Sequence, residues 1–193
     1  MLKQRIFTAI ILVALLIGML FSLSSFFFSL AIVPVIVLAG WEWTHLVKMS
    51  SKAQRLKFIM GLILLLIISG IGIGMGDSVR QHLAHGILLI ASALWMVIFC
   101  LIFTYPSGTR FWSKTTCLSA LGLLILLFTW IAIVYIQSLP SGSNLLLAAF
   151  AIIALSDVGG FIFGKLLGRH KLAPMISPGT VSYTHLTLPT ILL

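Results

Sequence analysis

The sequence predicts an all-α protein, a polytopic bundle of about six transmembrane helices. Hydrophobic residues make up 61% of the 193 positions and charged residues only 8%, whereas about a quarter of a soluble globular domain is charged. The chain also contains six apolar runs, each close to the ~20 residues that cross a bilayer core. Its abundance of Leu, Ile and Phe excludes a disordered chain as well, since disordered segments are poor in such residues.

The apolar runs give the expected helices in chain order. They are residues 6–23, 26–44, 58–76, 83–104, 117–137 and 145 to about 163. Only Ser24 and Ser25 separate the first two runs, so these should form a tight helical hairpin. The first run is longer than the apolar core of a secretory signal peptide and lacks a small-residue cleavage site, so we expect an uncleaved anchor.

The basic residues set the expected orientation. If the N-terminus lies in the cytoplasm, the six helices place eleven of the twelve Lys and Arg residues on the cytoplasmic side and only Arg80 outside. Cytoplasmic loops of membrane proteins carry this excess of positive charge, so both termini are expected to be cytoplasmic. The net charge of +9 then follows largely from topology. It requires no nucleic-acid partner and leaves anionic membrane lipid as a secondary partner.

The last residues differ in composition from the rest of the chain. From Val181 the sequence resembles the conceptual translation of a transposon-derived sequencing adapter, and non-native segments of this kind are set aside in fold reasoning. We therefore expect residues 1–179 to be the N-terminal part of a membrane-embedded domain and residues 180–193 to be non-native. In this interpretation the native message ends at Gly179, and the codon for Thr180 joins one native base to two bases of the adapter.

Asp157 is the acidic residue with the most informative position. It follows an apolar run that begins at Leu145, about 18 Å further along a helix axis. An ionisable side chain at membrane depth is costly and is by default a candidate functional residue. A carboxylate there could hold Mg²⁺, which prefers oxygen ligands and substrate phosphates. The equally weighted alternative is an aspartate at a helix end that water solvates.

Glycines recur every fourth residue after Asp157, at Gly160, Gly164 and Gly168. Small residues at this spacing let another helix or a ligand approach the backbone closely. Helix packing is the simpler explanation, and a homodimer formed through this face is one version of it.

A basic cluster follows the glycines and includes Lys165, His170 and Lys171. Cations beside a membrane carboxylate suit an anionic head group or the phosphates of a nucleotide, although ordinary positive-inside anchoring would also explain them. The turn that begins at Ser177 and ends at Gly179 could add backbone N–H groups that cradle a phosphate.

The stretch of residues 156–179 resembles the phosphatidate cytidylyltransferase (CDP-diacylglycerol synthase) family. That family typically shows an Asp-Ser-Gly-Ala-Tyr-type helix end, a Gly-Lys pair, a His-Lys-Leu triplet and a Ser-Pro-Gly-Lys-Thr turn. The matching residues here are Asp157-Val-Gly-Gly-Phe161, Gly164-Lys165, His170-Lys171-Leu172 and Ser177-Pro178-Gly179. The likeness covers essentially all of residues 1–179, but only this stretch is specific.

The resemblance implies an enzyme that transfers CMP from CTP to phosphatidic acid, giving CDP-diacylglycerol and pyrophosphate with Mg²⁺. It also implies a reaction at the cytoplasmic face of the bacterial inner membrane. By motif match, Asp157 would be catalytic and would hold the metal ion. The residues expected near nucleotide or lipid phosphates are Lys165, His170, Lys171, Ser177 and Gly179.

The chain departs from the family pattern at several positions. Phe161 stands where a tyrosine is common, Thr180 stands where the family has a lysine, and the C-terminal signature with its acidic residues is missing. We therefore expect the full-length parent to be the enzyme and the 193-residue chain to be inactive. The alternative from another class is a small ion or solute transporter with Asp157 as its ion site. The sequence does not show the inverted repeat or the further intramembrane polar residues that would favour it.

Overall fold

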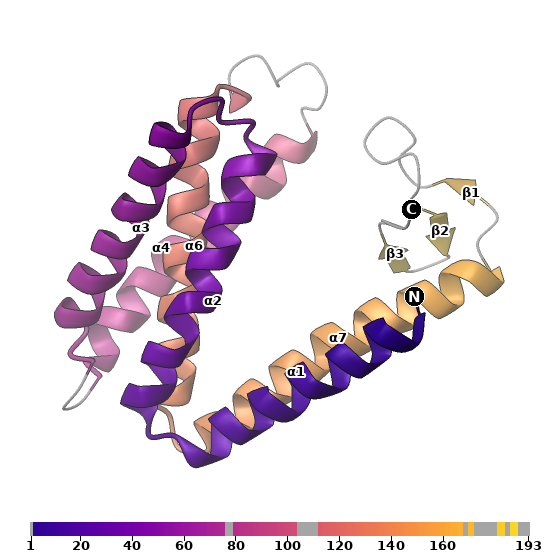
Figure 1. Ribbon diagram of the computed structural model, residues 1–193, viewed down its shortest axis with the longest axis horizontal. Helices are drawn as coiled ribbons and strands as arrows, with labels where there is room; N and C mark the ends of the chain where they lie inside the picture. The colour runs from indigo at the N-terminus through magenta and orange to yellow at the C-terminus, as the bar shows by residue number, and fades with distance from the viewer. Residues whose placement is uncertain are drawn as a thin grey trace. The chain divides into compact units, whose positions relative to one another are not determined.

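The computed structural model describes residues 2–75, 79–103, 112–167, 170–171, 181–183 and 186–188. The helices among them are α1 Leu2–Ser22, α2 Ser25–Leu46, α3 Lys52–Gly72, α4 Gln81–Phe103, α6 Thr115–Gln137 and α7 Gly142–Leu167 (Figure 1). They correspond in order to the six predicted runs, which confirms a helical membrane bundle. Five of the described helices are long and apolar enough to cross a membrane, and α1 adds a shorter apolar stretch, Phe7–Ser22.

The ends of α3 differ from the predicted apolar run of residues 58–76. The helix begins at Lys52 because Ser51 caps it: the Ser51 hydroxyl accepts a backbone N–H of the first turn at 3.2 Å, and Gln54 Oε1 accepts the Ser51 N–H at 3.4 Å. This reciprocal arrangement is a capping box, which polar residues can form outside an apolar run. The helix ends at Gly72, and Gly74 takes a φ of 74°, a left-handed conformation that suits glycine.

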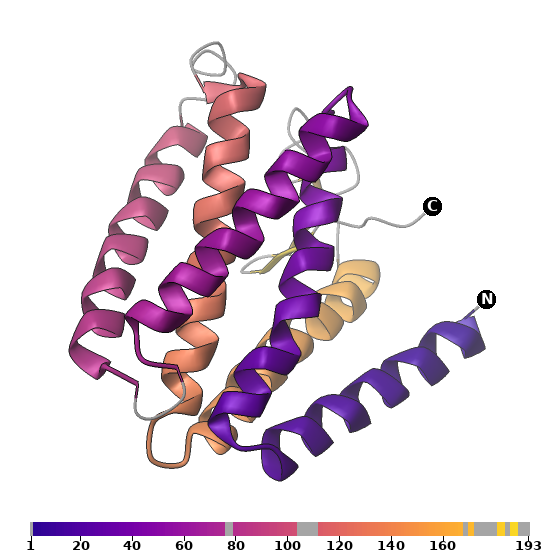
Figure 2. The same ribbon diagram turned by 60° about the vertical axis from the view of Figure 1, so that its left-hand side comes forward.

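The chain divides into two compact units, Met1–Ser143 and Asn144–Leu193. Within the first unit, α2 packs against α3 and α6, and α6 also contacts α3 and α4 (Figure 2). The largest side chains of this core are almost fully buried and include Phe28, Leu62, Trp130 and Ile131. In a bilayer such helices are held together mainly by close packing and hydrogen bonds, because lipid tails are as apolar as the core.

Two tryptophans tie α2 to α6. The Trp130 indole N–H donates to the backbone oxygen of Ser29 at 3.1 Å, and the Trp43 indole N–H donates to the backbone oxygen of Leu118 at 3.0 Å. One bond joins the start of α2 to the later part of α6 and the other joins their opposite ends, as an antiparallel pair requires. A Cβ at Gly122 would overlap the Trp43 indole, so this glycine lets the ring lie against α6.

A buried glutamine joins α1 to the turn between α6 and α7. Gln137 is 7% exposed, and its Nε2 donates to the backbone oxygen of Leu20 at 3.5 Å and to Ser143 Oγ at 3.1 Å. The Ser143 hydroxyl donates to the same Leu20 oxygen at 2.8 Å. Because backbone oxygens in the last turn of a helix lack helical partners, these donors satisfy an otherwise unpaired group at the end of α1.

The turn between α2 and α3 contains a residue in the left-handed conformation and is held by hydrogen bonds from an arginine side chain. Lys48 N–H donates to His45 O at 3.0 Å and Met49 N–H donates to Thr44 O at 3.1 Å, the pattern of a Schellman motif. Lys48 takes a φ of 55° at the position where glycine is preferred. Arg55 donates through Nε and Nη2 to Met49 O at 3.1 and 2.9 Å. These bonds fix the turn against the start of α3.

The second unit contains α7 and a small antiparallel sheet. Its strands are β1 His170–Lys171, β2 Val181–Tyr183 and β3 Leu186–Leu188, arranged across the sheet in that order. The sequence did not predict these strands, which have only two or three residues each and leave the helical class unchanged. Two of them fall within residues 180–193, and the non-native origin of that segment stays a prediction.

Candidate functional site

Asp157 lies on α7, the helix that carries most of the predicted site. The part of α7 that is long and apolar enough to cross a membrane is Gly142–Gly164. Asp157 is exposed and precedes the end of that span by seven residues, about 10 Å along the helix axis. The structure thus places a carboxylate on a spanning helix, in the part nearest its C-terminal end.

Two glycines lie on the helix face beside Asp157. Gly160 and Gly164 follow it at i+3 and i+7, which puts them on the same face, and both are buried. The hydroxyl of Ser156 donates back to the backbone oxygen of Ile152 at 2.7 Å, so it is occupied within the helix. A groove of about 350 Å³ runs along α7 between residues 152 and 163. Two of the three predicted glycines, Gly160 and Gly164, therefore lie on α7, and the third, Gly168, lies outside the described residues.

The other predicted site residues are described only in part. Lys165 lies in the last turn of α7, eight residues after Asp157 and about 12 Å further along the axis. His170 and Lys171 form β1, whose backbone pairs with β2. The predicted residues that lie outside the described part of the chain are Gly168, Ser177 and Gly179. The structure therefore brings Asp157 and Lys165 onto one end of one helix.

A single carboxylate is available on α7 as a metal ligand. Among the residues that the structure describes, no group of three or more His, Cys, Asp or Glu side chains could hold a metal ion. Mg²⁺ usually takes one or two carboxylates and completes its shell with water and substrate phosphates. Asp157 could supply one such carboxylate.

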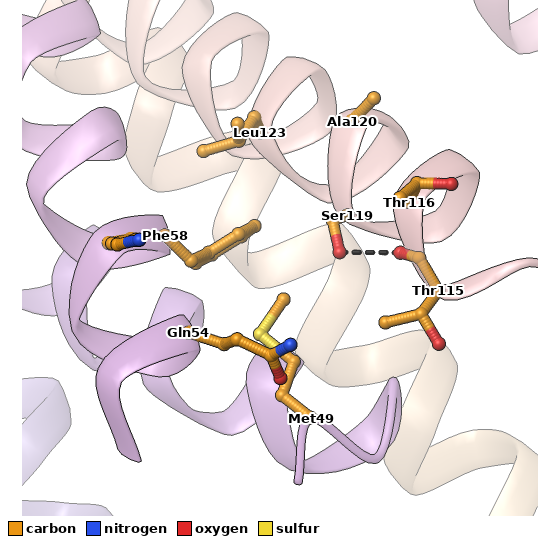
Figure 3. Close-up of a pocket in the computed structure, with 9 residues that line it drawn as sticks. Met49, Gln54, Phe58, Thr115, Thr116, Ser119, Ala120 and Leu123 are labelled. Atoms are coloured by element: carbon orange, nitrogen blue, oxygen red, sulfur yellow. Dashed lines mark hydrogen bonds between the residues drawn. The ribbon is translucent and has the colours of Figure 1, made fainter. Parts of the chain in front are cut away.

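A pocket in the first unit was not foreseen from the sequence. Its volume is about 460 Å³, and it lies between the α2–α3 turn, the start of α3 and the start of α6 (Figure 3). Its apolar lining consists of Met49, Phe58, Ala120 and Leu123. Its polar lining consists of Gln54, Lys57, Thr115, Thr116 and Ser119. The sequence offered one indication of this proximity. The basic residues near the start of α3 and those before α6 were both assigned to the cytoplasmic side of the membrane.

The fold and α7 together define a class: a multi-pass membrane protein with a carboxylate on a spanning helix. The sequence profile of the cytidylyltransferase family matches residues 3–181. The chain therefore belongs to the cytidylyltransferase family. No solved structure matches the chain with statistical significance.

Curated relatives align along most of this chain and are longer than it. The phosphatidate cytidylyltransferases of Pseudomonas aeruginosa and Haemophilus influenzae are each 32% identical, over 179 and 190 aligned residues. Both alignments cover 93% of this chain, but they cover 63% and 66% of the relatives. The chain thus spans slightly less than two thirds of these relatives. The phosphatidate cytidylyltransferase of Staphylococcus saprophyticus is 35% identical over 47% of this chain and 34% of its own length. The transporter alternative finds no support in these comparisons.

Proposed function

We propose that the chain is part of a phosphatidate cytidylyltransferase, which transfers CMP from CTP to phosphatidic acid. The observation that carries the proposal is the family match over residues 3–181. Within that match, Asp157, the glycine face and Lys165 share one spanning helix. A reaction between a lipid and a water-soluble nucleotide needs polar groups where a spanning helix approaches the membrane surface, and α7 supplies them.

The reaction joins a lipid phosphate to a nucleotide. An oxygen of the phosphatidic acid phosphate attacks the α-phosphorus of CTP, the bond from that phosphorus to the oxygen bridging to the β-phosphate breaks, and pyrophosphate leaves. Because several negative phosphates must approach one another, positive groups are needed to offset their charge. Lys165, His170 and Lys171 are the side chains that we propose for this task, with Ser177 and Gly179 near the phosphates.

Asp157 is the residue that we propose as the ligand of Mg²⁺. The bound ion would offset phosphate charge and orient the leaving pyrophosphate. Replacement of the carboxylate by an amide would keep the size of the side chain but remove its negative charge. The Asp157→Asn variant is therefore the most specific test of this role.

We also propose that the protein lies in the bacterial inner membrane with both termini and the active side in the cytoplasm. The bacterial relatives support this, as does the distribution of basic residues across the membrane. The small residues on α7 would suit a homodimer contact as well. The molecular mass of the detergent-solubilised protein, corrected for bound detergent, would distinguish a monomer from a dimer.

The test of function uses the complete source gene, because the relatives are longer than this chain. A long sequencing read across codon 179 should show a Lys-Thr continuation in place of residues 180–193; a tail that is encoded and followed by a stop codon would contradict this. The gene should then restore growth to a bacterium depleted of its own phosphatidate cytidylyltransferase. If the wild-type protein reaches the membrane but growth is not restored, the proposed function is wrong.

A further inference from the structure

Gln137 is the last residue of α6, and its amide is one of the buried polar groups of the first unit. The residue is 7% exposed. The turn that follows α6 folds back closely over it, because a Cβ at Gly142 would overlap the backbone oxygen of Gln137. Glycine allows this approach, and the next residue, Ser143, comes to lie beside the amide.

The partners of the Gln137 amide determine its orientation. Its Nε2 carries two hydrogens and donates to Leu20 O at 3.5 Å and to Ser143 Oγ at 3.1 Å. If the amide were rotated by 180°, Oε1 would face Leu20 O, and a backbone oxygen can only accept a hydrogen bond. The nitrogen is therefore the atom that faces α1, and Oε1 is the atom that these bonds leave over.

The amide oxygen of Gln137 has no donor. Oε1 is buried, and none of the described residues forms a hydrogen bond with it. The serine hydroxyls of this region already donate to backbone oxygens: Ser29 to Ser25 O at 2.6 Å, Ser138 to Tyr135 O at 2.7 Å and Ser143 to Leu20 O at 2.8 Å. Buried polar groups in native proteins almost always have a partner, and a bound water or ion is the usual one where the chain supplies none.

Two bonds of the same network are long. The Nε2 of Gln137 lies 3.5 Å from Leu20 O, and the Ser25 hydroxyl lies 3.5 Å from the backbone oxygen of Gln137, whereas well-formed bonds of these kinds are about 2.7–3.0 Å. Polar groups at such a separation are often bridged by a water molecule. Ser25 is exposed at the start of α2, so the network extends from the buried amide to the surface.

The charge of this region selects the kind of molecule that can bind. α1 and α6 both end here (Figure 1), and the C-terminal end of a helix carries partial negative charge. Residues 6–41 and 115–156 contain no Lys, Arg or His that would offset it. An anion is therefore disfavoured. The same segments contain no Asp or Glu to balance a metal ion, and the Nε2 hydrogens lie next to Oε1, so a neutral donor fits best.

We infer that a water molecule binds beside Gln137, donates one hydrogen to Oε1 and bridges to the Ser25 hydroxyl. It completes the hydrogen bonds that hold the end of α1 against the turn between α6 and α7. The inference does not depend on the proposed function, because it involves none of the residues proposed for cytidylyl transfer.

The test observes this water by nuclear magnetic resonance in the purified 193-residue chain in detergent micelles. The glutamine side chains are labelled with ¹⁵N, and Gln137→Met identifies the signal of Gln137 by its loss. Cross-peaks between water and the Nε2 hydrogens should have opposite signs in NOESY and ROESY spectra, because a bound water tumbles with the protein. Gln54 and Gln81 are exposed controls and should show only exchange with bulk water, which gives the same sign in both spectra.

Serine variants separate a bound water from exchange through a hydroxyl. Ser25→Ala should abolish the cross-peak, since a buried water needs at least two polar partners. Ser138→Ala removes a hydroxyl of the same turn that donates to Tyr135 O and should leave the cross-peak unchanged. Ser143→Ala removes the hydroxyl beside Nε2, so a cross-peak that persists in this variant does not arise from exchange of that hydroxyl.

Several results would overturn the inference. They are the absence of the cross-peak in the wild-type protein, its loss in Ser143→Ala, and equal effects of Ser25→Ala and Ser138→Ala. A saturable shift of the Gln137 amide signal when NaCl replaces choline chloride would identify a bound cation in place of water and would overturn it as well.

Discussion

The contact between Trp43 and Gly122 provides the sharpest test of how the bundle is held together. The Trp43 ring lies where the Cβ of any other residue at position 122 would be. Its N–H binds the backbone oxygen of Leu118, one helical turn earlier on α6. The Gly122→Ala substitution therefore adds one methyl group where the Trp43 indole of α2 lies against α6, next to the hydrogen bond between Trp43 and Leu118.

Two opposing effects set the expected change in stability. Alanine favours a helix over glycine by up to ~1 kcal/mol. Overpacking a filled contact costs about 1–3 kcal/mol, and displacement of the Trp43 indole would lose a hydrogen bond worth about 0.5–1.5 kcal/mol. We therefore expect Gly122→Ala to lower the free energy of unfolding by about 1–3 kcal/mol. Gly86→Ala is the control, because a Cβ there meets no atom within 4 Å, and it should be neutral or stabilising.

The assay is reversible unfolding in mixed micelles, followed by circular dichroism and by tryptophan fluorescence. A Trp43→Leu variant completes a double-mutant cycle, since Gly122→Ala should cost little once the indole is gone. The expected coupling between the two positions is about 1 kcal/mol or more. If Gly122→Ala stabilises the protein as much as Gly86→Ala does, or if the coupling is zero, the described α2–α6 contact is wrong.

Three further predictions concern helix ends and are measured as shifts in the same unfolding free energy. Lys48→Gly should raise it by about 0.5–1 kcal/mol, because Lys48 has a φ of 55° where glycine is less strained; a decrease would contradict the left-handed turn. Ser51→Ala should lower it by about 1 kcal/mol through loss of the cap of α3, whereas Ser50→Ala should have little effect. Gln137→Ala should lower it by about 1 kcal/mol, because the bonds from Nε2 to Leu20 O and Ser143 Oγ disappear while the buried Oε1, which has no partner among the described residues, is removed as well; an unchanged value would show that this network is not formed.

The sequence predicts the number and order of the helices because a membrane imposes a length and a composition on each span. It predicts helix ends less well, since an apolar run marks the part inside the bilayer and not the whole helix. α3 begins at Lys52 through the Ser51 cap, and α7 continues past Phe163 to Leu167. In both cases polar or charged residues extend the helix beyond the hydrophobic stretch.

Helix–helix contacts could not be predicted from one sequence. Trp43 lies between Glu42 and Thr44 near a helix end, which is typical of a membrane-interface residue, yet its indole N–H donates to the backbone of α6. The complementary signal is Gly122, 79 positions later, and nothing in the local pattern connects the two residues. The same limit applies to the pocket, because Lys57 and Thr115 are brought together only by the packing of α3 near α6.

For the candidate site, the sequence predicts the residues better than it predicts their spatial arrangement. Asp157 is recognisable from the sequence alone because a carboxylate within an apolar run is rare, and the structure places it on a spanning helix. The residues after the helix are recognisable by type and order, but the local pattern does not determine how far each lies from Asp157. Their individual roles therefore depend on measurements of the reaction.

The most direct measurement follows the phosphates of CTP during the reaction. Membranes that contain the protein from its complete gene are supplied with phosphatidic acid, Mg²⁺ and CTP labelled at either the α- or the γ-phosphate. The account predicts that the α-label enters the lipid fraction, that the γ-label leaves as pyrophosphate, and that Asp157→Asn lowers the rate about 100-fold or more. Lipid that stays unlabelled with the wild-type protein, or an Asp157→Asn protein of undiminished rate, would contradict it.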